Sequence, residues 1–227
     1  HQGDDRYNTG TNRSPEESQG QSFIQGAARG RWAEATDGHS LAGGLGIFTD
    51  RSGRDEYSAG SFSQGASYYF GLGLFSDHDG DDQYTALSHS QGYAAHFSLA
   101  GFFETKGDDS YNAASDPDRI TQIMGSGRDF SVGLFLDREG DDDYFFGNRS
   151  MGVGDIHGIG WAEDAQGNDT YTWWQNNMNE GVPSLGKETG LDDGMGMEGR
   201  VFIPGKTSHL GVFLDSGGQN HHIKEER

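Results

Sequence analysis

A pattern of apolar and polar positions recurs along the chain. Residues 73–84 show it most clearly: a short apolar run, an acid, a glycine turn, a pair of acids and a closing aromatic residue. Copies lie at 46–57, 101–111, 133–144, 160–171 and, in degraded form, 211–222, and a fragment opens the chain at 3–7. Short apolar runs between Gly and Asp turns predict two or three short β-strands per copy, and no stretch has helical periodicity with caps.

The spacing of the copies predicts their arrangement in space. The closing tyrosines stand at 57, 84, 111, 144 and 171, so the intervals are 27, 27, 33 and 27 residues. A fixed period in this range is typical of stacked repeats. A propeller blade needs about 40–50 residues, whereas 27 residues suit one coil of a parallel β-helix. We therefore predict one all-β domain over 1–227, a β-solenoid whose coils stack at about 4.8 Å.

Two longer intervals interrupt the period. They correspond to insertions, or degenerate coils, at about 8–40 and 172–210. Long loops on a rigid scaffold often carry binding sites, and aromatic planes suit stacking on a ligand, so Trp173 and Trp174 are candidate ligand- or partner-binding residues. The alternative is that both segments cover the open edges of the stack. The degraded last copy fits a terminal cap.

Composition and charge narrow the partners. The net charge of −20 leaves no basic patch for phosphates, so we exclude nucleic acid as a partner. The chain has no cysteine, hence no disulfide and no thiolate metal site. The sequence has no run of about 18 apolar residues, which is the length needed to span a membrane. Because the chain starts at His1, inside a repeat, we expect it to be a piece of a longer precursor.

Recurring acids are the main candidate chemistry. One acid follows the apolar run of each copy, with Thr105 in its place in the 101–111 copy, and a second precedes the closing aromatic residue by two positions. In a stack these acids would lie about 4.8 Å apart. Like charges at that distance repel by about 3.5 kcal/mol at an effective dielectric of 20. The candidate metal ligands are Asp50, Asp55, Asp77, Asp82, Asp109, Asp137, Asp142, Asp164 and Asp169.

Three arrangements could offset this repulsion: a bound cation, backbone N–H donors, or raised pKa values. Asp beside Gly is also ordinary turn chemistry, because its carboxylate accepts nearby backbone N–H groups. The closing tyrosines predict an aromatic ladder rather than a ligand platform. Gln64 and Gln91, each seven residues after a tyrosine, predict a short ladder of stacked amides.

No catalytic motif stands out. The nine histidines form no zinc-binding spacing, and neither a Gly-x-Ser-x-Gly elbow nor a Walker loop occurs. Two groups of charged residues fall outside the repeat, Asp116, Asp118, Arg119 and Arg128, and Asp192, Asp193, Glu198 and Arg200. They are the candidate sites of an alternative function, a polysaccharide lyase or hydrolase on this scaffold. We assign no catalytic residue and favour a non-enzymatic protein.

Two resemblances add to this interpretation. The turns at 80–84 and 167–171 resemble those of calcium-binding nonapeptide repeats in secreted bacterial proteins. The repeat phrase, with Ser-Gln-Gly at 18–20, 63–65 and 90–92, resembles repeat-rich bacterial exported or envelope proteins. Unlike the nonapeptide repeats, the chain lacks the flanking Gly-Gly, has a period of 27 rather than 9, and places Arg54 at the variable turn position.

These resemblances imply a location and a class of partner. They imply a Ca²⁺-binding β-solenoid that is secreted, or lies at the cell surface or in the periplasm. Its role would be that of a structural or protein-interaction module. Its partner would be an envelope or surface protein, or a glycan, and the chain could be one subunit of a larger assembly. A carbohydrate-binding module that uses Trp173 and Trp174 is a further alternative.

Overall fold

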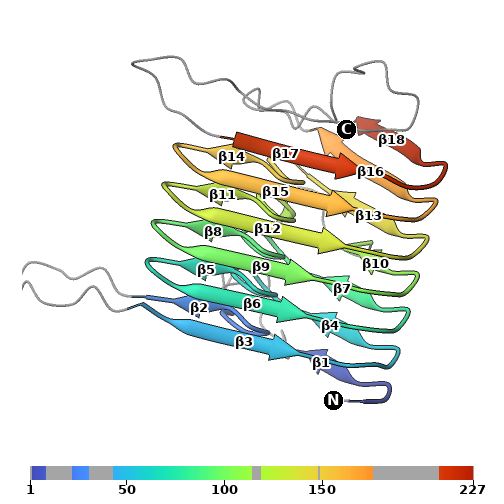
Figure 1. The fold of residues 1–227 in the computed structure, drawn as a ribbon, viewed down its shortest axis with the longest axis horizontal. Helices are drawn as coiled ribbons and strands as arrows, with labels where there is room; N and C mark the ends of the chain where they lie inside the picture. The colour runs from blue at the N-terminus through green and yellow to red at the C-terminus, as the bar shows by residue number, and fades with distance from the viewer. Residues whose placement is uncertain are drawn as a thin grey trace, which may run out of the picture.

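The chain folds as a parallel β-helix, as the repeat predicts. The computed structural model describes residues 2–8, 22–30, 43–113, 119–147, 149–175 and 210–226, without the side chains at 174–175 and 224–226. In this part of the chain, strands stack in three parallel sheets, one coil upon the next (Figure 1). The prediction of an all-β solenoid is confirmed.

Each sheet takes one strand from each coil. The front sheet comprises β3 (Leu45–Thr49), β6 (Leu72–Ser76), β9 (Leu99–Phe103), β12 (Val132–Asp137), β15 (Ile159–Asp164) and β17 (Leu210–Asp215). The tyrosine sheet comprises β1 (Arg6–Asn8), β4 (Glu56–Ser58), β7 (Gln83–Thr85), β10 (Ser110–Tyr111), β13 (Asp143–Phe146), β16 (Thr170–Gln175) and β18 (His221–Glu226). The short sheet comprises β2 (Ala28–Arg29), β5 (Ser67–Tyr68), β8 (Ala94–Ala95), β11 (Gly127–Arg128) and β14 (Gly154–Asp155).

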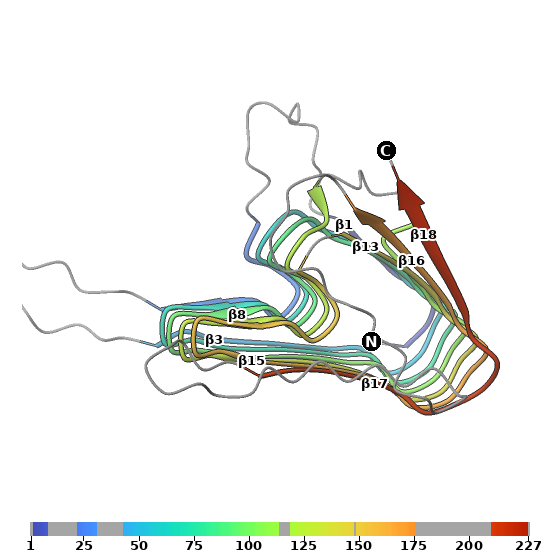
Figure 2. The same cartoon turned by 90° about the horizontal axis from the view of Figure 1, so that it is seen from above.

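A coil runs from the short sheet to the front sheet and then around a corner to the tyrosine sheet. Seen along the stack, the coils superpose, and the short and front sheets lie alongside each other (Figure 2). Glycine makes this close approach possible, because a Cβ on Gly73 of β6 would lie 2.2 Å from the carbonyl oxygen of Ala66. At the corner, Gly80 has φ of 155°, and a Cβ there would lie 1.6 Å from the Gly53 carbonyl oxygen.

Aromatic residues in register form the core. Tyr57, Tyr84 and their counterparts pair from coil to coil, and the rings of these two stack with centroids 5.0 Å apart. Phe75 and Phe102 stack at 4.7 Å in a second column, edge-on to the first. Both columns are buried, which confirms the predicted tyrosine ladder. Such rings contribute large apolar areas and about 0.5–1.5 kcal/mol per pair beyond that burial.

Amides form a third interior column. The Nε2 atom of Gln91 donates to Oε1 of Gln64 at 3.1 Å, and Asn112 exchanges hydrogen bonds with Gln91. The predicted glutamine ladder is therefore present. In the next two coils Met124 and Met151 occupy the position of these glutamines as buried apolar residues. The hydrogen-bonded amide ladder is therefore limited to the earlier coils.

The bend between the short and front sheets uses left-handed backbone without glycine. Phe70, Phe97 and Phe130 have φ of 57°, 61° and 59°. Non-glycine residues rarely adopt this conformation because Cβ crowds the carbonyl oxygen. Here their rings stack along the outside of the bend, with centroids 5.5 Å apart for the first pair and 5.2 Å for the second. Ring stacking between coils offsets part of the strain.

The register corrects one sequence alignment. Ala100, not Gly101, pairs with the column glycines Gly73 and Gly133. The copy therefore spans 100–111 and lacks no residue. Its acid position is held by Glu104, 1% exposed, rather than by Thr105. A bulky Phe103 ring covers Gly101, where a Cβ would lie 2.5 Å from that ring, and this explains the displaced glycine.

The first long interval contains a strand of the stack, and the second is followed by one. Within the interval at about 8–40, β2 pairs with β5, so that part of it belongs to the stack. The Ser-Gln-Gly at 18–20 lies outside the described residues, whereas Gln25 occupies a buried position in the stack. After the second interval, β17 and β18 pair directly with β15 and β16. The degraded last copy is thus a coil in register with the others.

Candidate functional site

The recurring acids form two columns inside the corner between the front and tyrosine sheets. We call these columns the acidic seam. The first column contains Asp50, Asp77, Glu104, Asp137, Asp164 and Asp215, and the second contains Asp5, Asp55, Asp82, Asp109, Asp142 and Asp169, followed by Asn220. All these acids except Asp5 are at most 2% exposed. Every predicted metal ligand therefore lies in the seam, and the sequence analysis missed Glu104.

Backbone amides hold the second column. The amide of each acid donates to Oδ1 of the acid one coil further on: Asp55 to Asp82 at 2.6 Å, Asp82 to Asp109 at 2.7 Å. The bond from Asp109 to Asp142 is 2.7 Å. One oxygen of each carboxylate is thus used as a cap for a backbone N–H. Backbone N–H donors therefore offset the repulsion at this half of the column's oxygens, but the donors lie one coil away rather than in the local turn that the sequence predicts.

Tyrosine hydroxyls reach the first column. Tyr57 donates to Asp77 of the following coil, and Tyr111 donates to Asp137 at 2.5 Å. Further up the stack the direction changes, and Tyr144 donates to Asp137 of its own coil at 2.9 Å. Asp137 consequently receives two hydroxyls on one oxygen, Oδ2. The aromatic ladder and the acids therefore form one hydrogen-bonded unit.

Among the described residues, five buried carboxylate oxygens lack a hydrogen-bond partner. They are Glu104 Oε2, Asp137 Oδ1, Asp164 Oδ1, Asp169 Oδ2 and Asp215 Oδ1. Each belongs to a side chain that is at most 1% exposed. A buried acceptor without a donor costs about 1–3 kcal/mol, and more when it is charged. Such oxygens require a proton, a cation or an ordered water.

The electrostatics agree with this requirement. Burial, and next the charge of Asp137, raises the pKa of Glu104 to about 9, of Asp142 to about 10 and of Asp164 to about 9. Burial likewise raises the pKa of Asp82 to about 7. The seam does not tolerate a full set of bare negative charges at neutral pH, so protons or cations must neutralise part of it.

Three groups within the seam have the geometry to hold a metal ion. They are Asp55, Asp77 and Asp82; Glu104, Asp109 and Asp137; and Asp142, Asp164 and Asp169. In each group, three carboxylate oxygens, one per residue, lie within 4.8 Å of one another. Carboxylate oxygens are the ligands of hard cations such as Ca²⁺ and Mg²⁺. The acidic seam is thus a candidate metal centre in the interior of the protein.

The predicted tryptophan surface has a different setting. Trp173 lies on β16 and is half-buried against the aromatic core. Trp174 follows it on the same strand, and its side chain lies outside the described part of the chain. Ligand binding by this pair remains a prediction.

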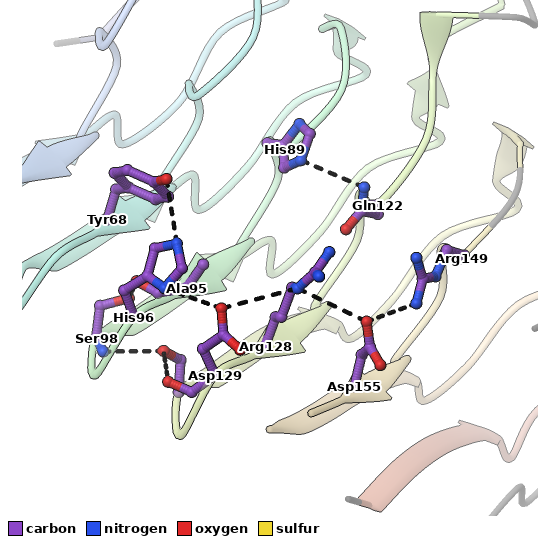
Figure 3. A network of polar contacts seen from close by, with 11 residues as sticks. Tyr68, His89, Ala95, His96, Ser98, Gln122, Arg128, Asp129, Arg149 and Asp155 are labelled. Atoms are coloured by element: carbon purple, nitrogen blue, oxygen red, sulfur yellow. Dashed lines mark hydrogen bonds and ion pairs between the residues drawn. The ribbon is translucent and has the colours of Figure 1, made fainter. Parts of the chain in front are cut away.

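A polar network outside the seam was not predicted (Figure 3). His96 lies between two partners: its Nδ1 is 2.9 Å from Oδ2 of Asp129, and its Nε2 is 3.1 Å from the Tyr68 hydroxyl. The His96 ring also stacks on Tyr69 with centroids 4.6 Å apart. The separation of 33 residues between His96 and Asp129 equals the longest tyrosine interval, and this was the available signal.

Arginines extend the network to the next coils. Arg128 Nε lies 3.8 Å from Asp129 and 3.7 Å from Asp155, and Arg149 lies 2.5 Å from Asp155. Of the charged cluster predicted around Arg128, Asp116 and Asp118 lie outside the described residues. So does the second cluster, Asp192, Asp193, Glu198 and Arg200. Cations and acids balance in this network, which links the outer sides of successive coils.

Comparisons with known proteins supply no further assignment. No protein family, curated protein or solved structure matches the chain. Over the described residues, no helix has the length and apolar character needed to cross a bilayer.

Proposed function

We propose that the chain is a non-enzymatic structural and interaction module of the bacterial envelope, secreted or surface-exposed, whose interior is stabilised by Ca²⁺. One observation carries this proposal. The recurring acids other than Asp5 are at most 2% exposed, so they cannot meet a macromolecular substrate. Their chemistry serves the folded state instead.

Calcium suits the seam on chemical grounds. The ion takes six to eight oxygen ligands at 2.3–2.6 Å in flexible geometry. Each acid group offers three carboxylates, and the described seam contains neither histidine nor any thiolate. Carboxylates alone disfavour the softer transition metals. A cation held only by the folded chain stabilises it by about 2.7 kcal/mol at a hundred times its Kd.

The outer surface supports a protein partner. Large apolar side chains point outward from the front sheet: Leu45 is 69% exposed, Ile47 61%, Leu99 42% and Ile159 39%. Contiguous exposed apolar area is typical of interaction sites. The partner that fits this face is an envelope or surface protein with an apolar patch of its own.

Thermal unfolding tests the calcium part of the proposal. Protein treated with EDTA and then dialysed is compared with protein in millimolar Ca²⁺ at pH 7.5, by far-UV circular dichroism. We expect a higher Tm with Ca²⁺, since the ion binds only the folded chain. Identical melting curves, together with no bound metal by elemental analysis, would remove calcium from the account.

The polar network favours a second candidate, a carbohydrate-active or carbohydrate-binding protein. Tyr68, His96 and Asp129 form a relay of hydrogen bonds at the surface, beside Arg128. This function predicts product release from acidic or neutral polysaccharides, or glycan binding without turnover. Loss of either on His96→Ala or on replacement of Trp173 and Trp174 would favour it over the structural module.

A further inference from the structure

Nine acids of the seam form three groups, and no residue belongs to two of them. Group 1 is Asp55, Asp77 and Asp82; group 2 is Glu104, Asp109 and Asp137; group 3 is Asp142, Asp164 and Asp169. The repeat makes the three groups look equivalent in sequence. Their hydrogen bonds are not equivalent.

Group 1 is satisfied by donors of the protein itself. Asp77 accepts the His78 amide on Oδ1 and the Tyr57 hydroxyl on Oδ2. Asp55 accepts the Asp5 amide and the Tyr57 hydroxyl, and its own amide caps Asp82. The remaining oxygen of Asp82 accepts the Tyr84 hydroxyl at 3.2 Å. Every carboxylate oxygen of this group therefore lies within hydrogen-bond distance of a donor, although Asp77 and Asp55 share the single hydroxyl proton of Tyr57.

Group 2 has two oxygens without a donor. Glu104 accepts the Lys106 amide on Oε1 at 3.0 Å, and its Oε2 has no partner. Asp137 receives both tyrosine hydroxyls on Oδ2, and its Oδ1 has none. Asp109 accepts an amide on one oxygen and the Tyr111 hydroxyl on the other. The unpartnered pair belongs to side chains that are each 1% exposed.

Group 3 repeats this deficit with different residues. Asp164 accepts the Tyr171 hydroxyl on Oδ2 at 2.7 Å, and its Oδ1 has no partner. Asp169 accepts the Asp142 amide on Oδ1, and its Oδ2 has none. These side chains are 1% and 0% exposed. Two buried acceptors again face a cluster of three carboxylates.

We propose that the described seam holds two divalent cations, one in group 2 and one in group 3, and none in group 1. This rests on the proposed function, and it fixes where the ions lie. A single proton shared by the two unpartnered oxygens of a group would satisfy both, but it leaves two of the group's three negative charges in the interior. A hard divalent cation coordinates both unpartnered oxygens of a group at once and offsets two of its three charges.

Cation counting with matched variants tests this assignment. The full chain is stripped with EDTA and titrated with Ca²⁺ by isothermal calorimetry, and bound ions are counted by native mass spectrometry. We expect Glu104→Gln and Asp164→Asn each to bind one ion fewer than the parent chain, and the control Asp77→Asn to bind as many as the parent. Loss of an ion on Asp77→Asn, or no loss on Glu104→Gln and Asp164→Asn, would overturn the assignment while leaving calcium binding intact.

A second measurement needs no variant, in case a substitution prevents folding. Crystals of the parent protein soaked in Tb³⁺ give anomalous peaks at the bound ions. We expect peaks beside Glu104 and Asp137 and beside Asp164 and Asp169. A peak beside Asp77 would contradict the assignment. If no ion binds by any of these methods, the calcium proposal fails with it, and protons alone neutralise the seam.

Discussion

Metal-free protein should lose stability as pH rises, the reverse of ordinary acid denaturation. The cause is the group of buried acids whose pKa values burial and the charge of Asp137 raise: Glu104 to about 9, Asp142 to about 10 and Asp164 to about 9. In the unfolded chain such acids have pKa values of about 4. Between pH 5 and 8 each of these three acids therefore holds in the folded chain a proton that it has released in the unfolded chain.

The expected slope follows from this difference. Each proton bound only by the folded chain changes the free energy of unfolding by about 1.4 kcal/mol per pH unit, so three give about 4 kcal/mol per unit. Because the pKa values of these acids are higher in the folded chain, their contribution to the free energy of unfolding is complete below about pH 4. This contribution decreases as the pH rises above 4 and is lost once the pH passes the pKa values of the folded chain, about 9 to 10. A typical domain has a free energy of unfolding of about 5–15 kcal/mol, so a change of about 4 kcal/mol per pH unit is a large part of its stability.

Urea unfolding in EDTA at pH 5, 6, 7 and 8 measures the slope. Asp142→Asn should reduce the slope by about 1.4 kcal/mol per pH unit, because the proton that Asp142 holds in the folded chain is gone. Asp141→Asn, the exposed neighbour, should leave it unchanged. With Ca²⁺ present, the ion replaces the protons, so its stabilising effect should grow with pH. Stability that stays flat or rises with pH in EDTA would refute raised pKa values in the seam.

Two further pairs of substitutions test the packing of the seam and of the sheets. Tyr111→Phe removes the hydroxyl that Asp137 accepts at 2.5 Å, and should lower the free energy of unfolding by about 1–3 kcal/mol in urea. Tyr84→Phe, whose hydroxyl meets Asp82 at 3.2 Å, should cost less, and equal costs would argue against the hydroxyl–acid contact. Gly73→Ala puts a Cβ 2.2 Å from the Ala66 carbonyl oxygen and should separate the sheets, with a cost above about 3 kcal/mol. Ala100→Gly, in the same column, should cost no more than about 1 kcal/mol, and a tolerated Gly73→Ala would contradict the observed sheet packing.

Much of the fold could be predicted from the period alone. Tyr57 and Tyr84 recur at one coil length with an acid two positions earlier, and a parallel stack then requires both columns. The sequence could not show that the acids point inward. An Asp beside a glycine turn is equally compatible with solvent, and only the route of the coil around the corner places it in the interior.

The reasons why the sequence did not reveal Glu104 and the polar network can be identified. Gly101 looks like a column glycine, and that resemblance moved the alignment by one residue and placed Thr105 where Glu104 belongs. A longer acid also broke the recurrence of aspartate that revealed the other ligands. The network of Tyr68, His96 and Asp129 draws on strands of two residues and on left-handed turns, which apolar periodicity does not reveal.

Burial of the recurring acids is the central claim, and carboxyl footprinting tests it directly. Carbodiimide coupling of glycine ethyl ester labels accessible carboxylates, and adjacent acids provide internal controls. Asp81 and Asp82 are neighbours, but the side chain of Asp81 is 54% exposed and Asp82 is 1% exposed. Mass spectrometry should find Asp81 and Asp141 labelled while Asp82 and Asp142 stay unmodified until the chain unfolds. Equal labelling within each pair on the folded protein would place the acids in solvent and contradict the account.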